Sequence, residues 1–236
     1  MKHKLFILSV FVLLGFSFKC KAQNWQWSKQ VGSNILQSYD YGAVITDGNN
    51  SYLIGYYSSK IFLQTDTLLS SGSNDLFIIK YDPSGNELWA KGFGGNGTSV
   101  NDLESVNAVF DSSTNSIYLS GSFSGTMILG NDTLNSSPNS LALYVAKVDL
   151  NGNFLWAKSI KSTDFNQFGQ TPDAEVFCSP NGVVYLTGGL KDTVVYSGYT
   201  LLPGGFLLKF DSNGNCLFGR NLFSNLVNRV LSLIHI

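Results

Sequence analysis

The chain has 236 residues, enough for one or two domains, and it carries a formal net charge of −1 with only 13% charged residues. It contains no dense run of Lys or Arg, which excludes nucleic acid as a main partner because such binding neutralises several phosphates at once. The 44% hydrophobic and 14% aromatic content favours an all-β protein with a real core.

The N-terminus has the pattern of a signal peptide. A basic start at Lys2–Lys4 precedes an apolar run, Leu5–Phe18, which is short for a bilayer span. Cys20-Lys21-Ala22 offers a small-x-small cleavage site, so we expect residues 1–22 to be removed. The mature protein is then exported, secreted or held on the outer surface, without a stable membrane span. Lipid attachment at Cys20 is the alternative, although the residues before it fit a lipoprotein signal poorly.

The last residues, 231–236, look foreign to the rest of the chain, so we expect a native part at 23–230 that is a fragment of a longer protein. This part contains no histidine. Its absence excludes Ser-His-Asp and Cys-His nucleophilic mechanisms and the common zinc sites. Glycosidase chemistry that uses two carboxylates remains open.

A single repeat accounts for most of the sequence. Its aromatic markers are Trp27, Trp89, Trp156 and Phe218. Successive markers are 62, 67 and 62 residues apart, and a period of this kind made of short β-like runs indicates a repeat architecture. We place the repeats at about 34–95, 96–162 and 163–224.

Each repeat has the same predicted order of elements. A short strand comes first, at Ala43–Thr46, Ala108–Phe110 and Glu175–Phe177. After a polar turn, a second strand ends in a glycine, at Gly55, Gly121 and Gly188. A variable hairpin follows, at 61–69, 127–135 and 194–202. Two further strands are joined by an Asp-x-x-Gly-Asn turn, with its glycine at Gly85, Gly152 and Gly214. In such turns the Asp side chain bonds the backbone ahead and Gly takes the positive-φ position.

The third strand of the repeat predicts how the sheets are arranged. Leu76–Ile79 and Leu141–Ala146 are apolar on both faces, which indicates that both faces of the sheet are covered. No convincing amphipathic helix is available as cover, so we expect sheets stacked on sheets, as in a β-propeller with one four-stranded blade per repeat. The predicted fold class is all-β, with three complete blades of a larger propeller after a lone strand at Trp25–Val31.

The pattern IYLSGSF at 117–123, followed by LYVAKVDLNGNFLWAKS at 143–159, resembles the propeller repeats of secreted and surface proteins from Bacteroidetes-type bacteria, SBBP-type repeats among them. The resemblance covers about 24–224. It implies an exported, non-catalytic scaffold for binding or structure at the cell surface, with a glycan or a surface protein as partner and no cofactor. Such proteins often end in a type IX secretion sorting domain, and the sequence contains nothing like it.

An enzyme is the alternative function. Asp82, Gly85 and Trp89 resemble the tryptophan-docking motif of pyrroloquinoline-quinone propellers. The alternative is therefore a propeller enzyme, either a quinoprotein dehydrogenase or a carboxylate glycosidase, whose active residues lie in missing blades. The sequence assigns no residue to a catalytic, cofactor or metal site.

Three recurring features have two interpretations each. The aromatic markers either stack a ligand or pack between blades, and packing is favoured because one strand position carries them all. Lysines recur at Lys80, Lys147 and Lys209, and cations recur at Lys29, Lys91, Lys158 and Arg220. They either form anion-binding rings or pair with carboxylates at strand ends. The Asp-x-x-Gly-Asn turns either bind calcium or serve only as turns, and they lack the spaced carboxylates of a calcium loop.

Two residue types suggest covalent chemistry. Asp-Thr-aliphatic triplets resemble a Bacteroidetes O-glycosylation signal, with Thr67, Thr133 and Thr193 as the acceptors. Cys178 and Cys216 fall on the first and fourth strands of one repeat, about 14 Å apart at normal strand spacing. A disulfide needs Cα atoms within about 7 Å, so we expect two buried thiols instead.

Overall fold

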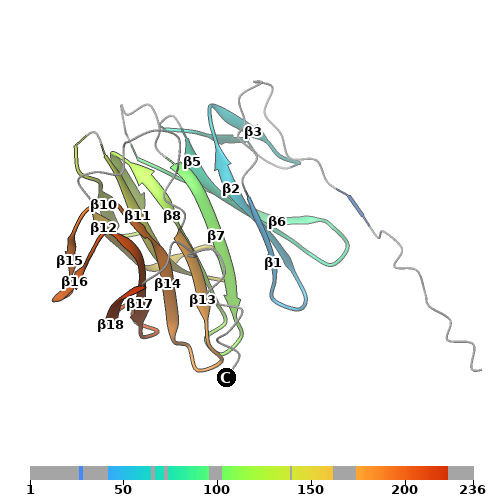
Figure 1. Ribbon diagram of the computed structural model, residues 1–236. Helices are drawn as coiled ribbons and strands as arrows, with labels where there is room; N and C mark the ends of the chain where they lie inside the picture. Colours follow the sequence, from blue (N-terminus) through green and yellow to red (C-terminus); the bar gives the residue numbers. More distant parts are fainter. Residues whose placement is uncertain are drawn as a thin grey trace, which may run out of the picture.

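The computed structural model describes residues 27–28, 42–64, 67–71, 74–95, 103–138, 140–161 and 174–222. Every helix or strand element in these ranges is a β-strand, which confirms the all-β prediction (Figure 1). Within them, no apolar helix is long enough to span a bilayer. The predicted signal peptide (1–22) and the tail at 231–236 lie outside the described residues.

Each repeat forms one four-stranded antiparallel sheet. The first sheet, in spatial order, contains β1 (Ala43–Thr46), β2 (Ser51–Tyr57), β5 (Asp75–Tyr81) and β6 (Glu87–Phe93). The second contains β7 (Leu103–Asp111), β8 (Ser116–Ser124), β11 (Leu141–Asp149) and β12 (Phe154–Lys161). The third contains β13 (Ala174–Cys178), β14 (Val184–Leu190), β17 (Gly204–Phe210) and β18 (Cys216–Leu222).

The variable section of each repeat is a separate two-stranded hairpin, as predicted. The three hairpins are β3 (Lys60–Phe62) with β4 (Thr67–Leu69), β9 (Thr126–Leu129) with β10 (Asp132–Asn135), and β15 (Val194–Tyr196) with β16 (Tyr199–Leu201). Each hairpin is inserted between the second and third strands of its sheet. The inserted hairpin explains why the repeat is longer than the roughly 40–50 residues of a common propeller blade.

The prediction that the second strand ends at its glycine is wrong. β2 continues to Tyr57, β8 to Ser124 and β14 to Leu190. Gly55 and Gly121 instead allow close approach inside the strand. A Cβ at Gly55 would lie 2.8 Å from the Phe77 ring, and one at Gly121 would collide with the Ser105 carbonyl.

The predicted lone strand at Trp25–Val31 lies mostly outside the described residues. Trp27 and Ser28 are described, and neither belongs to a strand.

The second sheet lies between the other two, with both faces covered (Figure 1). Along β11, Ala142, Tyr144 and Ala146 pack with residues of the first sheet. The alternate residues Leu141, Leu143 and Val145 pack with residues of the third. All of them are buried, which confirms that the apolar run is covered by a sheet on each side. The described sheets form an open stack.

Leu143 and Leu155 test this arrangement as a matched pair, because they lie on neighbouring strands of the second sheet and are 0% and 54% exposed. We expect Leu143→Ala to lower the free energy of unfolding by about 2–5 kcal/mol, because it leaves a cavity between two sheets. Leu155→Ala is expected to change it by less than about 0.5 kcal/mol. Urea denaturation measures both, and equal losses would contradict the central position of β11.

Candidate functional site

A β-bulge at the same place in every repeat organises the recurring side chains. The register of the last hairpin shifts after Lys80, Lys147 and Lys209. In each case the fourth strand has one unpaired residue, which is Leu88, Leu155 or Leu217, and this leucine is about half exposed. The bulge brings the next residue, the aromatic marker, directly opposite the lysine and onto the same face.

The second strand adds a tyrosine to this face. Tyr52 pairs with Lys80, Tyr118 with Lys147 and Tyr185 with Lys209. Each sheet therefore carries a row of tyrosine, lysine and aromatic marker, which we name the cross-strand triad. Its members are Tyr52–Lys80–Trp89, Tyr118–Lys147–Trp156 and Tyr185–Lys209–Phe218. Sequence reasoning missed the tyrosines, although their recurrence in YLIG, YLSG and YLTG was a visible signal.

Within a triad the lysine lies over the tyrosine ring. The Nζ atom is 5.2 Å from the ring centroid for Lys80 and Tyr52, and 5.3 Å for Lys147 and Tyr118. These are cation–π distances, worth about 0.5–1 kcal/mol at exposed sites and more when desolvated. Burial lowers the pKa of Lys147, and the nearby Asp111 carboxylate opposes that effect.

In the first two triads the aromatic marker packs on the turn glycine of the next sheet, not of its own. A Cβ at Gly152 would lie 2.9 Å from the Trp89 ring, and one at Gly214 would lie 2.8 Å from the Trp156 ring. Trp27 stands in the same relation to Gly85, at 2.6 Å. Trp89 and Trp156 therefore pack between successive sheets, and Trp27 packs on the first sheet in the same way. The motif Asp82–Gly85–Trp89 did not reveal this packing, because its glycine and its tryptophan do not contact each other. Gly85 lies against Trp27, and Trp89 lies against Gly152.

The lysine of the triad also crosses to the next sheet. Lys80 Nζ donates to the Leu150 carbonyl and Lys147 Nζ to the Ser212 carbonyl, both at 3.1 Å. Each acceptor follows the aspartate of the next turn. The lysines therefore do not pair mainly with carboxylates, as one interpretation expected. They satisfy backbone carbonyls that turn formation leaves free. We name the ring-on-glycine contact and this hydrogen bond together the inter-sheet latch.

The turns that receive the latch are held by their aspartates. Asp149 Oδ1 accepts the backbone N–H groups of Asn151 and Asn153, and its Oδ2 accepts the Asn153 side-chain amide, all at 2.8–2.9 Å. Asp82 and Asp211 make the same bonds in their own turns. The glycines at the third position after each aspartate have φ between 75° and 80°. Since N–H donors occupy the carboxylate oxygens, turn chemistry accounts for the motif.

These hydrogen bonds hold the aspartate pKa values low. For Asp82 and Asp211 the leading cause is the side-chain amide of the following Asn86 or Asn215. For Asp149, burial raises the pKa, but the backbone and side-chain bonds from Asn153 outweigh it and the net direction is down.

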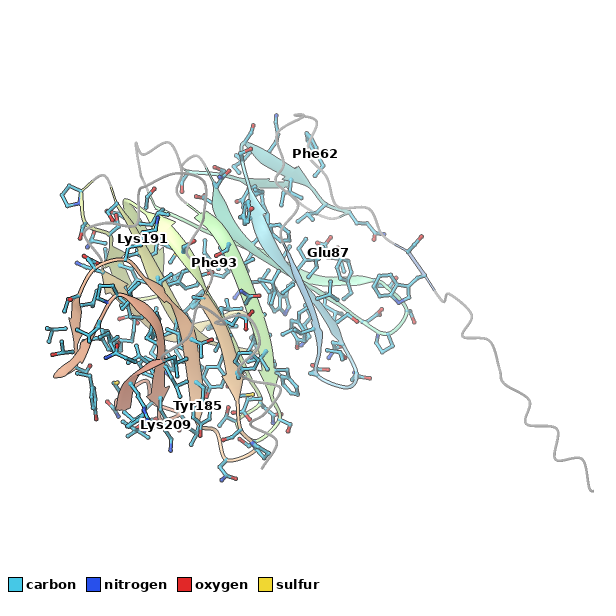
Figure 2. The ribbon with its side chains drawn as sticks, in the orientation of Figure 1. Phe62, Glu87, Phe93, Tyr185, Lys191 and Lys209 are labelled. Atoms are coloured by element: carbon cyan, nitrogen blue, oxygen red, sulfur yellow. The ribbon has the colours of Figure 1, made fainter. Side chains whose placement is uncertain are left out.

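The third triad lacks a latch among the described residues. Phe218 is 40% exposed, whereas Trp156, its counterpart in the second sheet, is 8% exposed. Lys209 Nζ lies 5.9 Å from the Tyr185 ring centroid. Figure 2 shows Tyr185 and Lys209 close together at one end of the third sheet. No further turn follows to receive this triad within the described ranges.

The described members of the second set of recurring cations have different surroundings, and Lys158 is half-buried on β12. Lys91 Nζ donates to the Asn151 carbonyl at 2.7 Å and to Asn153 Oδ1 at 3.2 Å, so it strengthens the same turn that Trp89 contacts. Arg220 is exposed. Lys29 lies outside the described residues.

The predicted glycosylation acceptors are all on the surface. Thr67, Thr133 and Thr193 are exposed, the first two on the second strands of the β3–β4 and β9–β10 hairpins. The aspartate before Thr133 has a structural role, since Asp132 Oδ2 accepts the Ala157 backbone N–H at 2.7 Å. The threonines are therefore accessible, while this aspartate holds its hairpin against β12.

Cys178 and Cys216 are free and lie on the first and fourth strands of the third sheet. The prediction that they form no disulfide is confirmed, but the thiols are half-buried instead of buried, because both lie at strand ends. Burial, with help from the Asp111 charge, raises the pKa of the Cys178 thiol to about 11.

Nowhere in the described part of the chain do three or more His, Cys, Asp or Glu side chains gather as metal ligands. No family model matches the sequence, and no curated protein matches it either. The likeness to Bacteroidetes propeller repeats therefore stays a prediction.

The candidate site is the face of the third sheet that carries the triad Tyr185–Lys209–Phe218.

The latch can be tested with two glycines of similar positive φ. Gly152 has φ +75° and its Cβ position meets Trp89, whereas Gly198 has φ +84° with nothing within 4 Å. Both alanine substitutions strain the backbone by about 1–2 kcal/mol. We expect Gly152→Ala to cost a further 1–3 kcal/mol or so, because the Trp89 ring must move. Chemical denaturation compares them, and equal destabilisation would show that the ring contact contributes nothing.

The turn aspartates predict a dependence of stability on pH. Their folded pKa values lie below the ordinary 3.8, so their contribution is complete above that value and is lost as pH falls through the lowered pKa. We expect the melting temperature to be nearly constant from neutral pH to about 5 and to fall below about 4. A triple variant, Asp82→Asn, Asp149→Asn and Asp211→Asn, should lose less stability over the acid range. An unchanged acid slope in thermal melts would refute this role.

Proposed function

We propose that this chain contributes three blades to an exported, non-catalytic β-propeller that serves as a scaffold for binding or structure at the cell surface. The observation that carries the proposal is the inter-sheet latch, which joins the first sheet to the second and the second to the third through equivalent residues. Units that contact only their neighbours through one repeated interface form a repeat scaffold. Four-stranded sheets repeated about an axis are the blades of a propeller.

The chemistry of the recurring residues supports a scaffold. Lys80 and Lys147 are bonded to backbone carbonyls, and the turn aspartates accept backbone and amide N–H groups. Burial raises the pKa of Tyr118 to about 12 and that of Cys178 to about 11. General acids and bases work best with a pKa near the operating pH, so these two groups are poorly placed for catalysis at neutral pH.

Export and surface placement rest on the sequence. The basic start, the apolar run and Ala22 form the pattern of a cleaved signal peptide. The exposed threonines, Thr67, Thr133 and Thr193, are accessible to a modifying enzyme that acts on exported proteins. A glycan or a surface protein is the proposed partner, and the loops at the ends of the stacked sheets are where scaffolds of this kind present variable residues.

One preparation tests the function. The full chain is expressed in a Bacteroidetes-type host and recovered from the medium or the cell surface, and its intact mass is measured. We expect a mass that corresponds to cleavage after Ala22. The recovered protein is then applied to a glycan array and titrated with pyrroloquinoline quinone and calcium. The proposal predicts retention on a glycan without turnover and no quinone binding.

The opposite results are equally informative. Calorimetric binding of quinone with calcium would favour the quinoprotein alternative, and hydrolysis of the retained glycan would favour the carboxylate glycosidase. An uncleaved protein recovered from the cytoplasm would contradict export. As a control for unspecific sugar stacking on exposed rings, Phe62→Ala removes a 46% exposed aromatic of the β3–β4 hairpin.

A further inference from the structure

Each sheet has one face that carries its cross-strand triad, which we name the leading face. The leading face of the first sheet packs on the second sheet, and that of the second packs on the third. No further four-stranded sheet covers the leading face of the third sheet among the described residues, where the Tyr199 ring of the β15–β16 hairpin lies 6.3 Å from the Phe218 ring. Its surroundings can therefore be compared, position by position, with two faces whose partner is known.

The third leading face keeps the apolar character of the two covered ones. Phe177 pairs with Tyr185 on it, as Val109 pairs with Tyr118 on the second leading face. Leu207 on β17 pairs with Arg220 on β18. At the equivalent positions of the second sheet, Val145 pairs with Lys158. The third leading face thus has the side chains of an interface, including a large aromatic that is 40% exposed.

The charges on this face also match those on the covered ones. On the first sheet, Lys80 and Lys91 both reach the Asp149 turn of the second sheet. The charge of Lys91 helps to lower the pKa of Asp149. Lys209 and Arg220 occupy the same two positions on the third sheet. Two cations beside an aromatic ring are complementary to a turn that presents a carboxylate, free carbonyls and a bare glycine.

We propose that the leading face of the third sheet docks a further four-stranded repeat of the same design. The Asp-x-x-Gly-Asn turn of that repeat receives the Phe218 ring on its glycine and Lys209 on the carbonyl after its aspartate. The proposal rests on the scaffold proposed above, and it adds the surface and the chemistry of its partner. Continuity with two existing interfaces of the same chain is the argument for this occupant.

A second copy of the chain does not offer the same partner. The first sheet would have to present its own turn, but Trp27 already covers Gly85, and Trp27 Nε1 donates to the Pro83 carbonyl at 3.2 Å. The glycine that would receive the Phe218 ring is therefore already covered from within the chain. A repeat whose turn glycine is uncovered is the fitting partner.

The test measures side-chain accessibility by hydroxyl-radical footprinting with mass spectrometry. The full chain is compared with an extended chain in which a second copy of residues 163–224 follows residue 224. We expect oxidation of Phe218 to fall about fivefold in the extended chain, the ratio of the 40% exposure of Phe218 to the 8% of Trp156. Leu217, 48% exposed and outside the triad, is the internal control and should not change.

A matched variant ties the protection to the latch. In this variant the appended copy carries alanine at the position equivalent to Gly214. A Cβ at Gly214 itself would lie 2.8 Å from the Trp156 ring, and the new Cβ would lie equally close to the docked Phe218 ring. Oxidation of Phe218 should then return to the level of the full chain. Lys209→Ala in the extended chain should raise Phe218 oxidation part of the way, because only the hydrogen bond is lost.

Four outcomes would overturn the proposal. Phe218 that is already protected in the dilute full chain is covered by another part of that chain. Phe218 protected only at high concentration is covered by a second copy. Undiminished Phe218 oxidation in the extended chain, or an appended repeat that stays unfolded, shows that this face does not support a further repeat. None of these outcomes alters the export, glycan or quinone results, so failure here is distinguishable from failure of the proposed function.

Discussion

An aromatic ring resting on a glycine of the neighbouring sheet is the contact on which the rest of this structure depends. The glycine is needed twice at the same point, because its φ lies near +75° to +80° and because a Cβ would enter the ring. The turn aspartate holds that glycine in place through bonds to the backbone ahead. Turn geometry and sheet stacking are therefore one constraint.

The β-bulge connects this contact to the chemistry of each sheet. It places the aromatic marker opposite the lysine, which pairs on its other side with a tyrosine of the second strand, so that three side chains form a row across three strands. The row presents a cation and a flat ring to the next turn. A latch of this composition has a direction, since the ring and the cation always come from the earlier sheet and the glycine and the carbonyl from the later one.

This direction changes how the recurring polar residues are understood. Lysines at one position of every repeat suggest an anion-binding ring when the sequence is considered alone. In the structure, Lys80 and Lys147 each bridge two sheets, and their charges are used against carbonyl groups. The recurrence of a lysine at this position is therefore better explained by the interface between units than by a bound ligand. For the scaffold function proposed above, we expect binding specificity to reside in the residues that differ among the hairpins and loops.

The sequence alone determined the β class, the three units, their strand order and the covered third strand. These follow from local signals: Asp-x-x-Gly-Asn turns that force a reversal, and apolar runs such as Leu141–Ala146 that cannot remain exposed on either face. Only the tertiary structure decided which glycine each aromatic covers, where Lys80 and Lys147 bond, and that β2, β8 and β14 run past their glycines. The reason is physical. Turns and periodicity depend on neighbours in the chain, whereas a ring placed by a bulge meets a residue about 60 positions away, and that pairing exists only once the sheets have stacked.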